Sequence, residues 1–344
     1  MNEIDAGMAA EFRAAPDAVR RQAEALAAPM AELAARLRRN NAPRLVVTCA
    51  RGSSAHAATF GKHLIERHLG IPVAAAAPNV ATVYGQRLRL AGELFLTISQ
   101  SGRSDDLVES AAMAKAAGAL TVAIVNDTES PLAQASDIVL PMAAGPELSV
   151  AATKTFVASL AALLRLAAAW TDDRAFDAAL ERLPERVSAA SDLDWSAVLN
   201  VLASTKSLVA IGRGPTLAIA REASLKFKET CDLHAEAFSG AEFLHGPVAL
   251  VSMRYPILMF TPTDAAAAGL GELAADLRRK GAAVFITEAG EGGEGRLPAL
   301  APDHPDADAV CLIQSFYGLI VRLAERRGTN VNRPRHLQKV TRTR

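Results

Sequence analysis

Short apolar runs alternate with longer amphipathic stretches along most of the chain. The runs are rich in Val, Ile and Leu and end at glycine or at polar residues, a pattern that is typical of buried β-strands. The stretches between them are rich in Ala and Leu at helical spacing. Continuous apolar strands joined by helices indicate parallel sheets that are covered on both faces. We therefore predict a doubly wound α/β sheet in each half of the chain, with strands near residues 44–52, 94–99 and 120–125, and near residues 207–214, 256–261 and 283–287.

The strand pattern of the first half recurs in the second half at a nearly constant distance. Arg213 stands near the end of its apolar run as Arg51 does, and the two positions are 162 residues apart (213 − 51). Thr261 lies the same distance beyond Ser99 (261 − 99). A fixed offset of this kind is typical of a duplicated unit, so the pattern predicts two domains of the same fold.

The amphipathic stretches place the predicted helices and the domain limits. Helices are expected over roughly 17–39, 54–69, 105–117, 153–169 and 314–327. The predicted organisation is an N-terminal helical segment at 1–40, a first domain at 41–172, a helical connection at 173–194, a second domain at 195–329 and a C-terminal tail at 330–344.

Composition narrows the class of protein. The chain has 344 residues, half of them hydrophobic, which suffices for two domains with complete cores. Lys plus Arg and Asp plus Glu each number 37, so the net charge is zero and a nucleic-acid partner is not expected. The three cysteines, Cys49, Cys231 and Cys311, are far apart and form no C-x-x-C pair, which favours a reduced compartment.

Neither a signal peptide nor a membrane span is expected from the N-terminus or from the apolar stretch at 156–170. The first residues, Met1 to Asp5, carry acidic side chains where a signal peptide carries basic ones. The apolar stretch at 156–170 is too short to cross a bilayer and is interrupted by Arg165. We expect a cytoplasmic protein without a membrane partner.

A serine-rich loop follows the second predicted strand. It runs Ser99-Gln100-Ser101-Gly102-Arg103-Ser104 and precedes a predicted helix. In parallel sheets, anions bind beyond the carboxyl ends of the strands, where helix-start amides and the helix dipole favour negative charge. Serine hydroxyls add donors, and a glycine permits close approach of the backbone. This loop is therefore predicted to hold a phosphate, the alternative being an ordinary turn with Ser104 as a helix cap.

A second set of donors follows the first predicted strand, at Gly52, Ser53 and Ser54. It is expected to converge with the serine-rich loop on one ligand. In the second half of the chain, Pro262 replaces a backbone donor and Asp264 brings negative charge, so that copy is degraded. We predict one phosphate site per chain.

Metal and nucleotide sites are not expected. His56, His63 and His68 share one predicted helix, but their spacings of seven and five differ from the spacing of four that is usual for metal ligands on a helix. The glycine-rich run at 290–295 lacks the G-K-[ST] ending of a nucleotide-binding loop and is predicted to be a surface loop.

These motifs, taken together, resemble a known family. The chain is similar to the sugar isomerase (SIS) domains, and more closely to the tandem pair that forms the isomerase half of glucosamine-6-phosphate synthase. The resemblance covers almost the whole chain and implies two flavodoxin-like sugar isomerase domains with a C-terminal tail. The segments that carry it are 51–54, 99–104, 150–156, 222–229, 233–238, 244–247 and 332–339.

The resemblance implies a role for each matching residue. Glu229 is implied as the base that moves a carbon-bound proton, with Lys226 and Glu222 as supports. His245 is implied in ring opening, reaching the site of a neighbouring subunit in a homodimer. Lys339 matches a lysine that forms an imine with the open sugar. The residues implied in substrate binding are Gly52, Ser53, Ser54, Ser99, Gln100, Ser101, Ser104 and Val150.

Each of these residues also has an ordinary structural interpretation. Glu222, Lys226 and Glu229 lie at i, i+4 and i+7, which is also the spacing of an exposed salt-bridge face. A lone histidine such as His245 is more often structural than catalytic. Lys339 stands in a basic tail with Arg342 and Arg344, where positive charges are usually solvated. Only the family pattern favours the catalytic assignments.

The expected activity follows from one departure from the family pattern. The resembling synthase carries an amidohydrolase domain whose amino-terminal cysteine releases ammonia from glutamine. The sequence holds no such segment, and its first cysteine is Cys49, so we expect no ammonia from glutamine. The leading prediction is a deaminase that converts glucosamine 6-phosphate and water to fructose 6-phosphate and ammonia, with no cofactor and no metal.

Several other functions stay open. The substrate is alternatively galactosamine 6-phosphate or a fructosamine phosphate that is deglycated. The chain is also consistent with an isomerase subunit that receives ammonia from a separate glutaminase. A non-catalytic alternative is a sugar-phosphate sensor, although sensors usually carry a DNA-binding helical domain. In each case the expected ligand is a hexosamine 6-phosphate or a hexose 6-phosphate.

Overall fold

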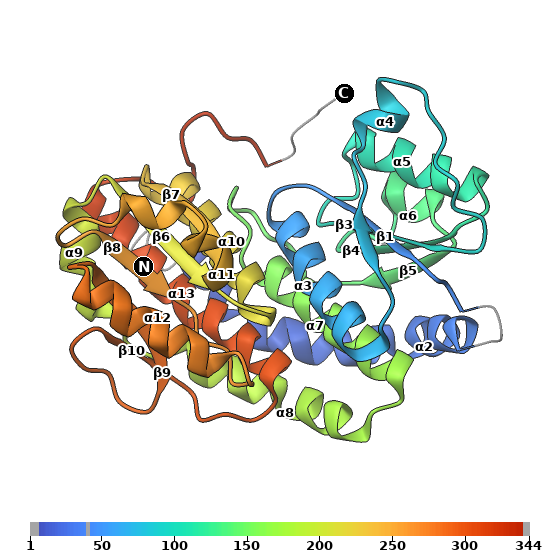
Figure 1. The fold of residues 1–344 in the computed structure, drawn as a ribbon. Coiled ribbons are helices and arrows are strands. Elements are labelled where there is room, and N and C mark those ends of the chain that lie inside the picture. Colours follow the sequence, from blue (N-terminus) through green and yellow to red (C-terminus); the bar gives the residue numbers. More distant parts are fainter. Residues whose placement is uncertain (1–6, 39–41, 340–344) are drawn as a thin grey trace. The chain divides into compact units, whose positions relative to one another are not determined.

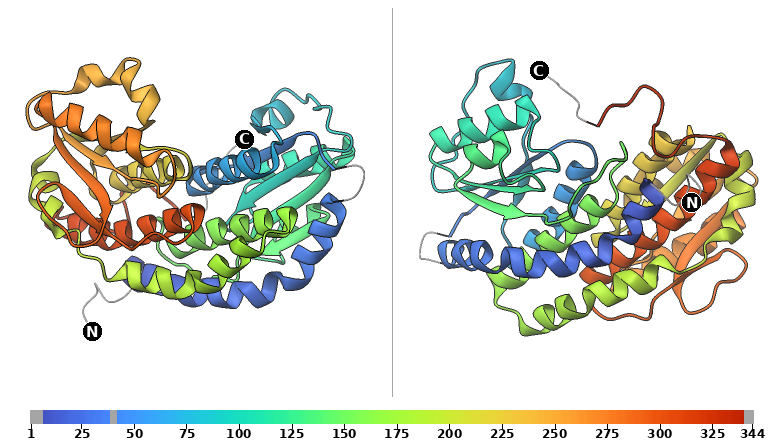
Figure 2. Two further views of the ribbon diagram at one scale, coloured as in Figure 1. Left: turned by 60° about the horizontal axis from the view of Figure 1, so that its bottom comes forward. Right: turned by 180° about the vertical axis from the view of Figure 1, so that it is seen from behind.

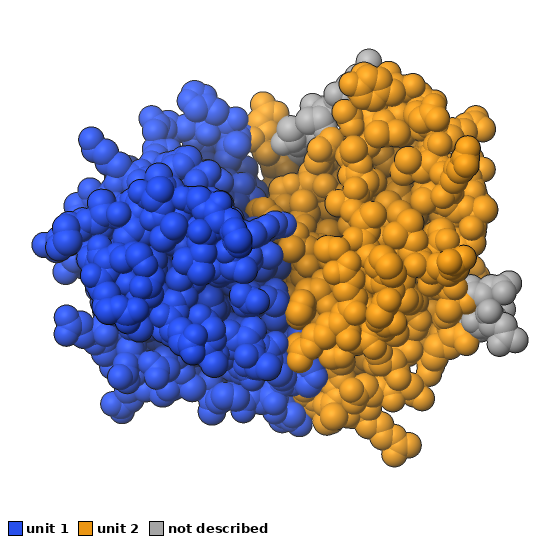
Figure 3. Space-filling view, in the orientation of Figure 1, with its two compact units in different colours: residues 1–16, 148–153, 182–337 blue, residues 17–147, 154–181, 338–344 orange. Residues whose placement is uncertain are grey.

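The computed structural model describes residues 7–38 and 42–339. The acidic N-terminal residues Met1 to Asp5 and the tail arginines Arg342 and Arg344 lie outside the described residues, as do the outer ends of the predicted segments 1–40 and 330–344. The chain divides into two compact units, coloured separately in Figure 3. Unit 1 comprises residues 1–16, 148–153 and 182–337, and unit 2 comprises residues 17–147, 154–181 and 338–344.

Unit 2 holds a five-stranded parallel sheet with the order β2-β1-β3-β4-β5 (Figure 1). In its register, Ala50 lies opposite Ile98 and Ser99 opposite Val125. The strand order reverses between β1 and β3, so the loops that follow these two strands emerge side by side at the carboxyl edge. The strands are β1 (Val46–Ala50), β2 (Val73–Ala75), β3 (Leu94–Ser99), β4 (Leu120–Val125) and β5 (Ile138–Pro141).

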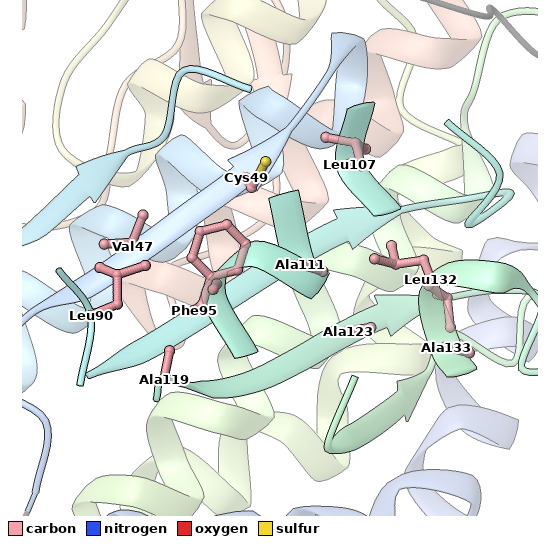
Figure 4. Packing of buried hydrophobic residues seen from close by; sticks show 12 residues of the cluster. Val47, Cys49, Leu90, Phe95, Leu107, Ala111, Ala119, Ala123, Leu132 and Ala133 are labelled. Atoms are coloured by element: carbon pink, nitrogen blue, oxygen red, sulfur yellow. The ribbon is translucent and has the colours of Figure 1, made fainter. Parts of the chain in front are cut away.

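Helices cover both faces of this sheet. Figure 4 shows one face, where Leu107 and Ala111 of α5 and Leu132 of α6 belong to one hydrophobic cluster with Phe95 and other strand residues. The central strands β1, β3 and β4 are buried along nearly their whole length, which explains why they appear in the sequence as continuous apolar runs. The elements that complete unit 2 are α2 (Ala15–Leu37), α3 (Gly52–Leu69), α4 (Asn79–Thr82), α5 (Asp105–Ala116), α6 (Pro131–Ala135) and α7 (Lys154–Thr171).

Unit 1 holds a second parallel sheet with the order β7-β6-β8-β9-β10. Read from the matching edge, this is the same order as in unit 2, which is the topology that the 162-residue repeat predicts. Two further views show helices on both faces of each sheet (Figure 2). The strands are β6 (Ser207–Gly212), β7 (His234–Ser239), β8 (Pro256–Met259), β9 (Ala283–Ala289) and β10 (Arg296–Ala299).

The fold prediction is therefore confirmed: the described chain contains two parallel five-stranded α/β sheets. Phe243 of α11 and Leu270 of α12 line one face of the second sheet, and α10 packs with α13. Unit 1 also contains α1 (Met8–Arg13), the short 3₁₀ helices Ser196–Val198 and Pro247–Leu250, α9 (Leu199–Ser204), α10 (Pro215–Cys231), α11 (Gly240–Leu244), α12 (Ala267–Arg279) and α13 (Pro305–Arg327), while α8 (Arg174–Ser191) contributes to both units.

The last helix begins earlier than the sequence pattern predicts. α13 starts at Pro305, whereas the predicted helix starts near residue 314. Proline at the first helical position, with Asp306 and Asp308 in the first turn, is a favourable helix start that the apolar periodicity does not reveal. α13 is long and apolar enough to cross a membrane by composition, but 83% of its most apolar window is buried inside the protein, as in the core helix of a folded domain.

The three cysteines lie in the described part of the chain as buried free thiols. Burial raises the pKa of the Cys49 thiol to about 11, and it raises the pKa values of Cys231 and Cys311 to about 12. These thiols are therefore protonated near neutral pH and belong to the core packing.

Candidate functional site

Two loops meet at the carboxyl edge of the sheet in unit 2. The segment Arg51–Ser54 follows β1 and opens α3, and Ser99–Ser104 follows β3 and precedes α5. β1 and β3 are neighbours, and the strand order reverses between them. This is the position at which open α/β sheets bind ligands. We call these two segments the phosphate cradle, after the role that the sequence predicts for them.

The serine-rich loop is shaped by its own side chains. The Ser99 hydroxyl accepts a hydrogen bond from the Gly102 amide at 3.1 Å, and the Ser101 hydroxyl accepts one from the Arg103 amide at 3.3 Å. Both hydroxyls act as acceptors in these bonds, so each retains its hydrogen for donation to a ligand. The local geometry therefore aligns the loop without consuming its hydroxyl donors.

The helix starts beside the cradle lack side-chain caps. Ser104 is the N-cap of α5 and Arg51 is the N-cap of α3, and neither side chain forms a capping hydrogen bond. Ser104 as a simple capping residue, the alternative considered from the sequence, is therefore not what the geometry shows. First-turn amides of a helix have no partner within that helix, and uncapped ones attract an anion.

An ion pair connects the two loops. Arg51 donates to the same carboxylate oxygen of Asp106, Oδ2, from Nε at 2.9 Å and from Nη2 at 2.7 Å. The Asp106 side chain is 1% exposed, while that of Arg51 is 53% exposed. Asp106 is the second residue of α5, so this contact joins the start of one cradle segment to the helix that follows the other.

At the corresponding position in unit 1, after β6, a threonine side chain forms hydrogen bonds with the surrounding backbone. Thr216 is the repeat partner of Ser54 (216 − 54 = 162). Its hydroxyl accepts a hydrogen bond from the Arg213 amide at 3.0 Å and donates to the Phe260 carbonyl at 2.6 Å. The donors that would face a ligand are used internally here, which supports the prediction of one phosphate site per chain.

Gly102 offers a direct test of the cradle geometry. Its φ is +62°, and a Cβ there would lie 2.1 Å from the buried Ser130 hydroxyl oxygen. Gly102→Ala is expected to lower the free energy of unfolding by about 1–3 kcal/mol and to weaken sugar-phosphate binding. Gly85→Ala is the matched control, because Gly85 has φ +60° with open space around its Cβ position.

Chemical denaturation of the wild type and both glycine variants measures how much each substitution lowers the free energy of unfolding. Gly85→Ala carries only the backbone strain, about 1 kcal/mol. Equal destabilisation by the two substitutions would show that the lack of space for a Cβ beside Ser130 does not constrain the loop.

Unit 1 brings Glu222, Lys226 and Glu229 together along α10. Lys226 Nζ lies 3.3 Å from Glu222 Oε1 and also forms an ion pair with Glu229 Oε2. The side chains of Glu222 and Lys226 are fully buried, whereas that of Glu229 is 20% exposed. The exposed salt-bridge face that the spacing also allowed is therefore excluded, and only Glu229 of the three is accessible.

The charge state of Lys226 follows from its partners. Burial acts to lower the pKa of the Lys226 ammonium, but the charges of Glu222 and Glu229 outweigh it, and the net effect raises the pKa. A protonated lysine between two carboxylates orients Glu229 and supplies positive charge beside it. Such a cluster is suited to a carboxylate that exchanges protons with a bound molecule.

Glu229 opens into a cavity of about 280 Å³ in unit 1. The cavity is lined by the end of α10, the end of α13 and the start of the tail, including Arg333 and Arg335. Arg335 forms an ion pair with Asp232 just beyond α10. A small polar molecule therefore has room beside Glu229, in a cavity lined by both arginines and acidic residues.

His245 lies apart from this cluster. It ends the short helix α11 on a loop, as the following Gly246-Pro247 predicts, and it is exposed. The start of α11 is fixed by a capping box between Ser239 and Glu242. Nearby Leu244, Leu250 and Met253 are exposed apolar side chains.

Lys339 has a partner that sequence reasoning missed. Its ammonium lies 3.2 Å from the carboxylate of Glu147, a fully buried side chain of the same unit. Thr155 donates its amide and its hydroxyl to the same carboxylate, at 3.1 Å and 2.5 Å. Lys339 is thus not a solvated tail charge. The two residues are 192 positions apart, and Glu147 in the run Pro146-Glu147-Leu148 gives no motif that would have revealed it.

Val150 lies in a short connecting segment, 148–153, that belongs to unit 1. The carboxylate of Glu11 accepts hydrogen bonds from the amides of Leu148 and Ser149 and fixes this segment. Val150 itself is partly buried. Glu11 is therefore a supporting residue that the sequence pattern did not identify.

The structure thus assembles the predicted site residues into separate groups. Gly52, Ser53 and Ser54 and the loop 99–104 follow two neighbouring strands of unit 2, where Lys339 also pairs with Glu147. Glu222, Lys226 and Glu229 form the cluster in unit 1, which also contains His245 and Val150.

A known protein family matches the segments of the chain that form most of the two sheets. The family model for the SIS domain matches residues 40–169 and 201–292. The glutamine–fructose-6-phosphate aminotransferase (isomerizing) of Caulobacter vibrioides is 32% identical over 316 residues, which cover 86% of this chain and 51% of that protein. The chain therefore spans about half the length of the curated relatives that it matches.

Solved structures agree in fold. A candidate phosphosugar isomerase from Silicibacter pomeroyi is 45% identical, with a TM-score of 0.88 over 94% of this chain and 98% of that one. The C-terminal domain of glucosamine-fructose-6-phosphate aminotransferase from Francisella tularensis is 26% identical, with a TM-score of 0.83 over 95% and 98% of the two chains. These similarities cover both units.

Proposed function

Because this chain belongs to the SIS domain family, with homology to phosphosugar isomerases, we propose that it is an amino-sugar phosphate deaminase. The proposed reaction converts glucosamine 6-phosphate and water to fructose 6-phosphate and ammonia. The observation that carries the proposal is the buried Lys226, held between Glu222 and a partly exposed Glu229. A sensor that only binds its ligand has no need of such a cluster.

The reaction divides into steps that need different groups. The sugar ring opens, a proton leaves C2 and another is added at C1, and the resulting imine at C2 takes up water and releases ammonia. The phosphate cradle anchors the sugar phosphate through serine hydroxyls and helix-start amides. Glu229 carries the proton between the two carbons, and Lys226 holds its carboxylate in place.

His245 is assigned to ring opening in the site of a neighbouring subunit. Its exposure on a loop beside the apolar side chains of Leu244, Leu250 and Met253 supports an interface between two copies of the chain. The proposal therefore includes a homodimer in which His245 serves the partner's site. Cytoplasmic location and the absence of cofactors stay predictions.

Mixing two inactive variants tests this arrangement. Glu229→Gln and His245→Asn homodimers are each expected to be inactive, because every site lacks one group. A mixed dimer has one site with both groups intact, so subunit exchange is expected to restore about a quarter of the wild-type activity if exchange is random. Ammonia release after mixing measures it. No recovery, with mixed dimers demonstrated by mass spectrometry, would remove His245 from the partner's site.

Lys339 is assigned to the open sugar. Its contact with the buried Glu147 supports a role within unit 2, where the phosphate cradle lies. In a deaminase the lysine closes the site or assists ring opening, and imine formation is the further possibility that the family resemblance implies.

A second candidate function is an isomerase subunit that takes ammonia from a separate glutaminase. The similarity to about half of the aminotransferase from Caulobacter vibrioides favours it, since the matching half is the isomerase half. In that case fructose 6-phosphate and ammonia are the substrates and glucosamine 6-phosphate is the product.

A substrate panel separates these functions. The purified protein is incubated with glucosamine 6-phosphate, its galacto epimer, a fructosamine phosphate, or fructose 6-phosphate with ammonium, and ammonia and sugar phosphates are measured. Ammonia and fructose 6-phosphate from the first substrate support the proposal. Ammonia from another substrate alone would reassign the substrate, and tight binding without any turnover would favour the sensor.

A further inference from the structure

The start of α5 presents a problem for phosphate binding. Asp105 and Asp106 occupy its first turn, where the helix dipole would otherwise attract an anion. Asp105 is exposed and its charge is screened by water, but Asp106 is buried. Asp106 follows Ser104 by two residues, so an uncompensated charge there opposes a phosphate in the cradle.

Arg51 supplies the compensating charge from the other cradle segment. Both of its donors engage Oδ2 of Asp106, at 2.9 Å and 2.7 Å. The other oxygen, Oδ1, is buried and has no hydrogen-bond partner among the residues that the structure describes. The guanidinium of Arg51 thus supplies positive charge to this carboxylate, and a buried carboxylate without a cation is costly.

We propose that Arg51 is a positioning residue that makes the cradle competent for a phosphate dianion by neutralising Asp106. The ligand class is a phosphate monoester, bound by the serine hydroxyls and the helix-start amides while Arg51 cancels the charge of Asp106. This inference rests on the proposed function in one respect: it assigns the phosphate to the cradle.

The other ion pairs of this helix and loop differ from the pair of Arg51. Arg103 pairs with Asp127 at 2.7 Å, but both side chains are more than one-third exposed, so water already screens that carboxylate. Lys115 pairs with Asp137 at 2.8 Å at the opposite end of α5. Lys115→Met therefore removes an ion pair from the same helix without touching the cradle, and it is the matched control.

Three substitutions separate charge compensation from a merely structural ion pair. Arg51→Met leaves the buried carboxylate uncompensated and is expected to raise the Kd for glucosamine 6-phosphate about 10-fold or more. Asp106→Asn breaks the same ion pair but removes the negative charge, so it is expected to bind at least as tightly as the wild type. Arg51→Lys keeps a positive charge and is expected to stay within about threefold of the wild type.

Calorimetric titration with glucosamine 6-phosphate and with inorganic phosphate gives the Kd values, and circular dichroism verifies folding. In turnover assays, Arg51→Met is expected to raise KM and to change kcat by less than about threefold, because the carbon-bound proton transfer does not involve Arg51. Lys115→Met is expected to leave Kd, KM and kcat within about twofold of the wild-type values. Should Arg51→Met fail to fold, Asp106→Asn and Arg51→Lys still give decisive Kd values.

The outcomes distinguish this inference from the proposed function. If Arg51→Met and Asp106→Asn weakened phosphate binding equally, the ion pair would be structural and the inference alone would be overturned. If Arg51→Met did not fold, weak phosphate binding by Asp106→Asn would overturn the inference in the same way. If Arg51→Met weakened phosphate binding and Asp106→Asn did not, but the wild type released no ammonia, the proposed reaction alone would be overturned. A wild-type protein that binds neither phosphate compound would overturn both.

Discussion

Replacement of Glu229 by glutamine is expected to lower the turnover number for glucosamine 6-phosphate by ~10²–10⁴-fold, the usual contribution of general acid–base catalysis. Glutamine has nearly the same size as glutamate but does not carry a proton between C2 and C1. Glu229 is the accessible member of the α10 cluster, with its side chain 20% exposed and open to a cavity of about 280 Å³.

Binding of the substrate is expected to survive this substitution. The phosphate cradle belongs to unit 2, so the Kd for glucosamine 6-phosphate is expected to change by less than about threefold. The control variant is Glu272→Gln, an exposed glutamate on α12 whose loss is expected to leave both values unchanged. If Glu229→Gln kept more than about a tenth of the wild-type turnover number, Glu229 would not be the base.

The second large effect concerns stability. Lys226→Met is expected to lower the free energy of unfolding by about 3–5 kcal/mol, because it removes an ammonium that pairs with the fully buried carboxylate of Glu222. The double variant Glu222→Gln with Lys226→Met removes both charges and is expected to recover part of this loss. Urea denaturation measures all three proteins.

A second lysine on α10 controls this prediction. Lys228→Met on the same helix removes an exposed side chain that donates to the Ala235 carbonyl at 3.1 Å, and it is expected to cost about 1 kcal/mol. A cost for Lys226→Met no larger than that of Lys228→Met would show that Lys226 does not neutralise a buried charge.

The pH dependence of the Lys226 contribution has a definite sign. Its partners raise the pKa of the ammonium in the folded state above the value of ~10.4 for an unfolded lysine. The stabilisation is therefore complete below the unfolded pKa and is lost only as the pH rises through the folded pKa. The cost of Lys226→Met is accordingly expected to be the same at pH 6 and pH 8.

The central strands could be predicted from the sequence because most of them are buried on both faces. β1, β3, β4, β6, β8 and β9 all coincide with predicted apolar runs. The strands β2, β5, β7 and β10 are shorter or more polar, and they lie toward the sheet edges. β7, for example, alternates polar His234 and Glu236 with buried Ala235, so it gives no continuous apolar signal.

The site was predictable where its residues lie close together in the sequence. Glu222, Lys226 and Glu229 fall on one helix, and their contacts follow from helical spacing. Partners brought together by the sheet leave no such pattern: Asp106 is 55 residues from Arg51, and Glu147 is 192 residues from Lys339. Only the topology, which places the ends of β1 and β3 side by side, relates Arg51 to Asp106.

The central claim is that this chain anchors an amino sugar by its phosphate and releases the amino group as ammonia. The most direct test follows ammonia and ketose over time with glucosamine 6-phosphate and, separately, with glucosamine that lacks the phosphate. The predicted result is equal molar amounts of ammonia and fructose 6-phosphate from the phosphorylated sugar, and a rate at least about 100-fold lower from the other. Release of neither product from glucosamine 6-phosphate, or equal rates from the two sugars, would contradict the account.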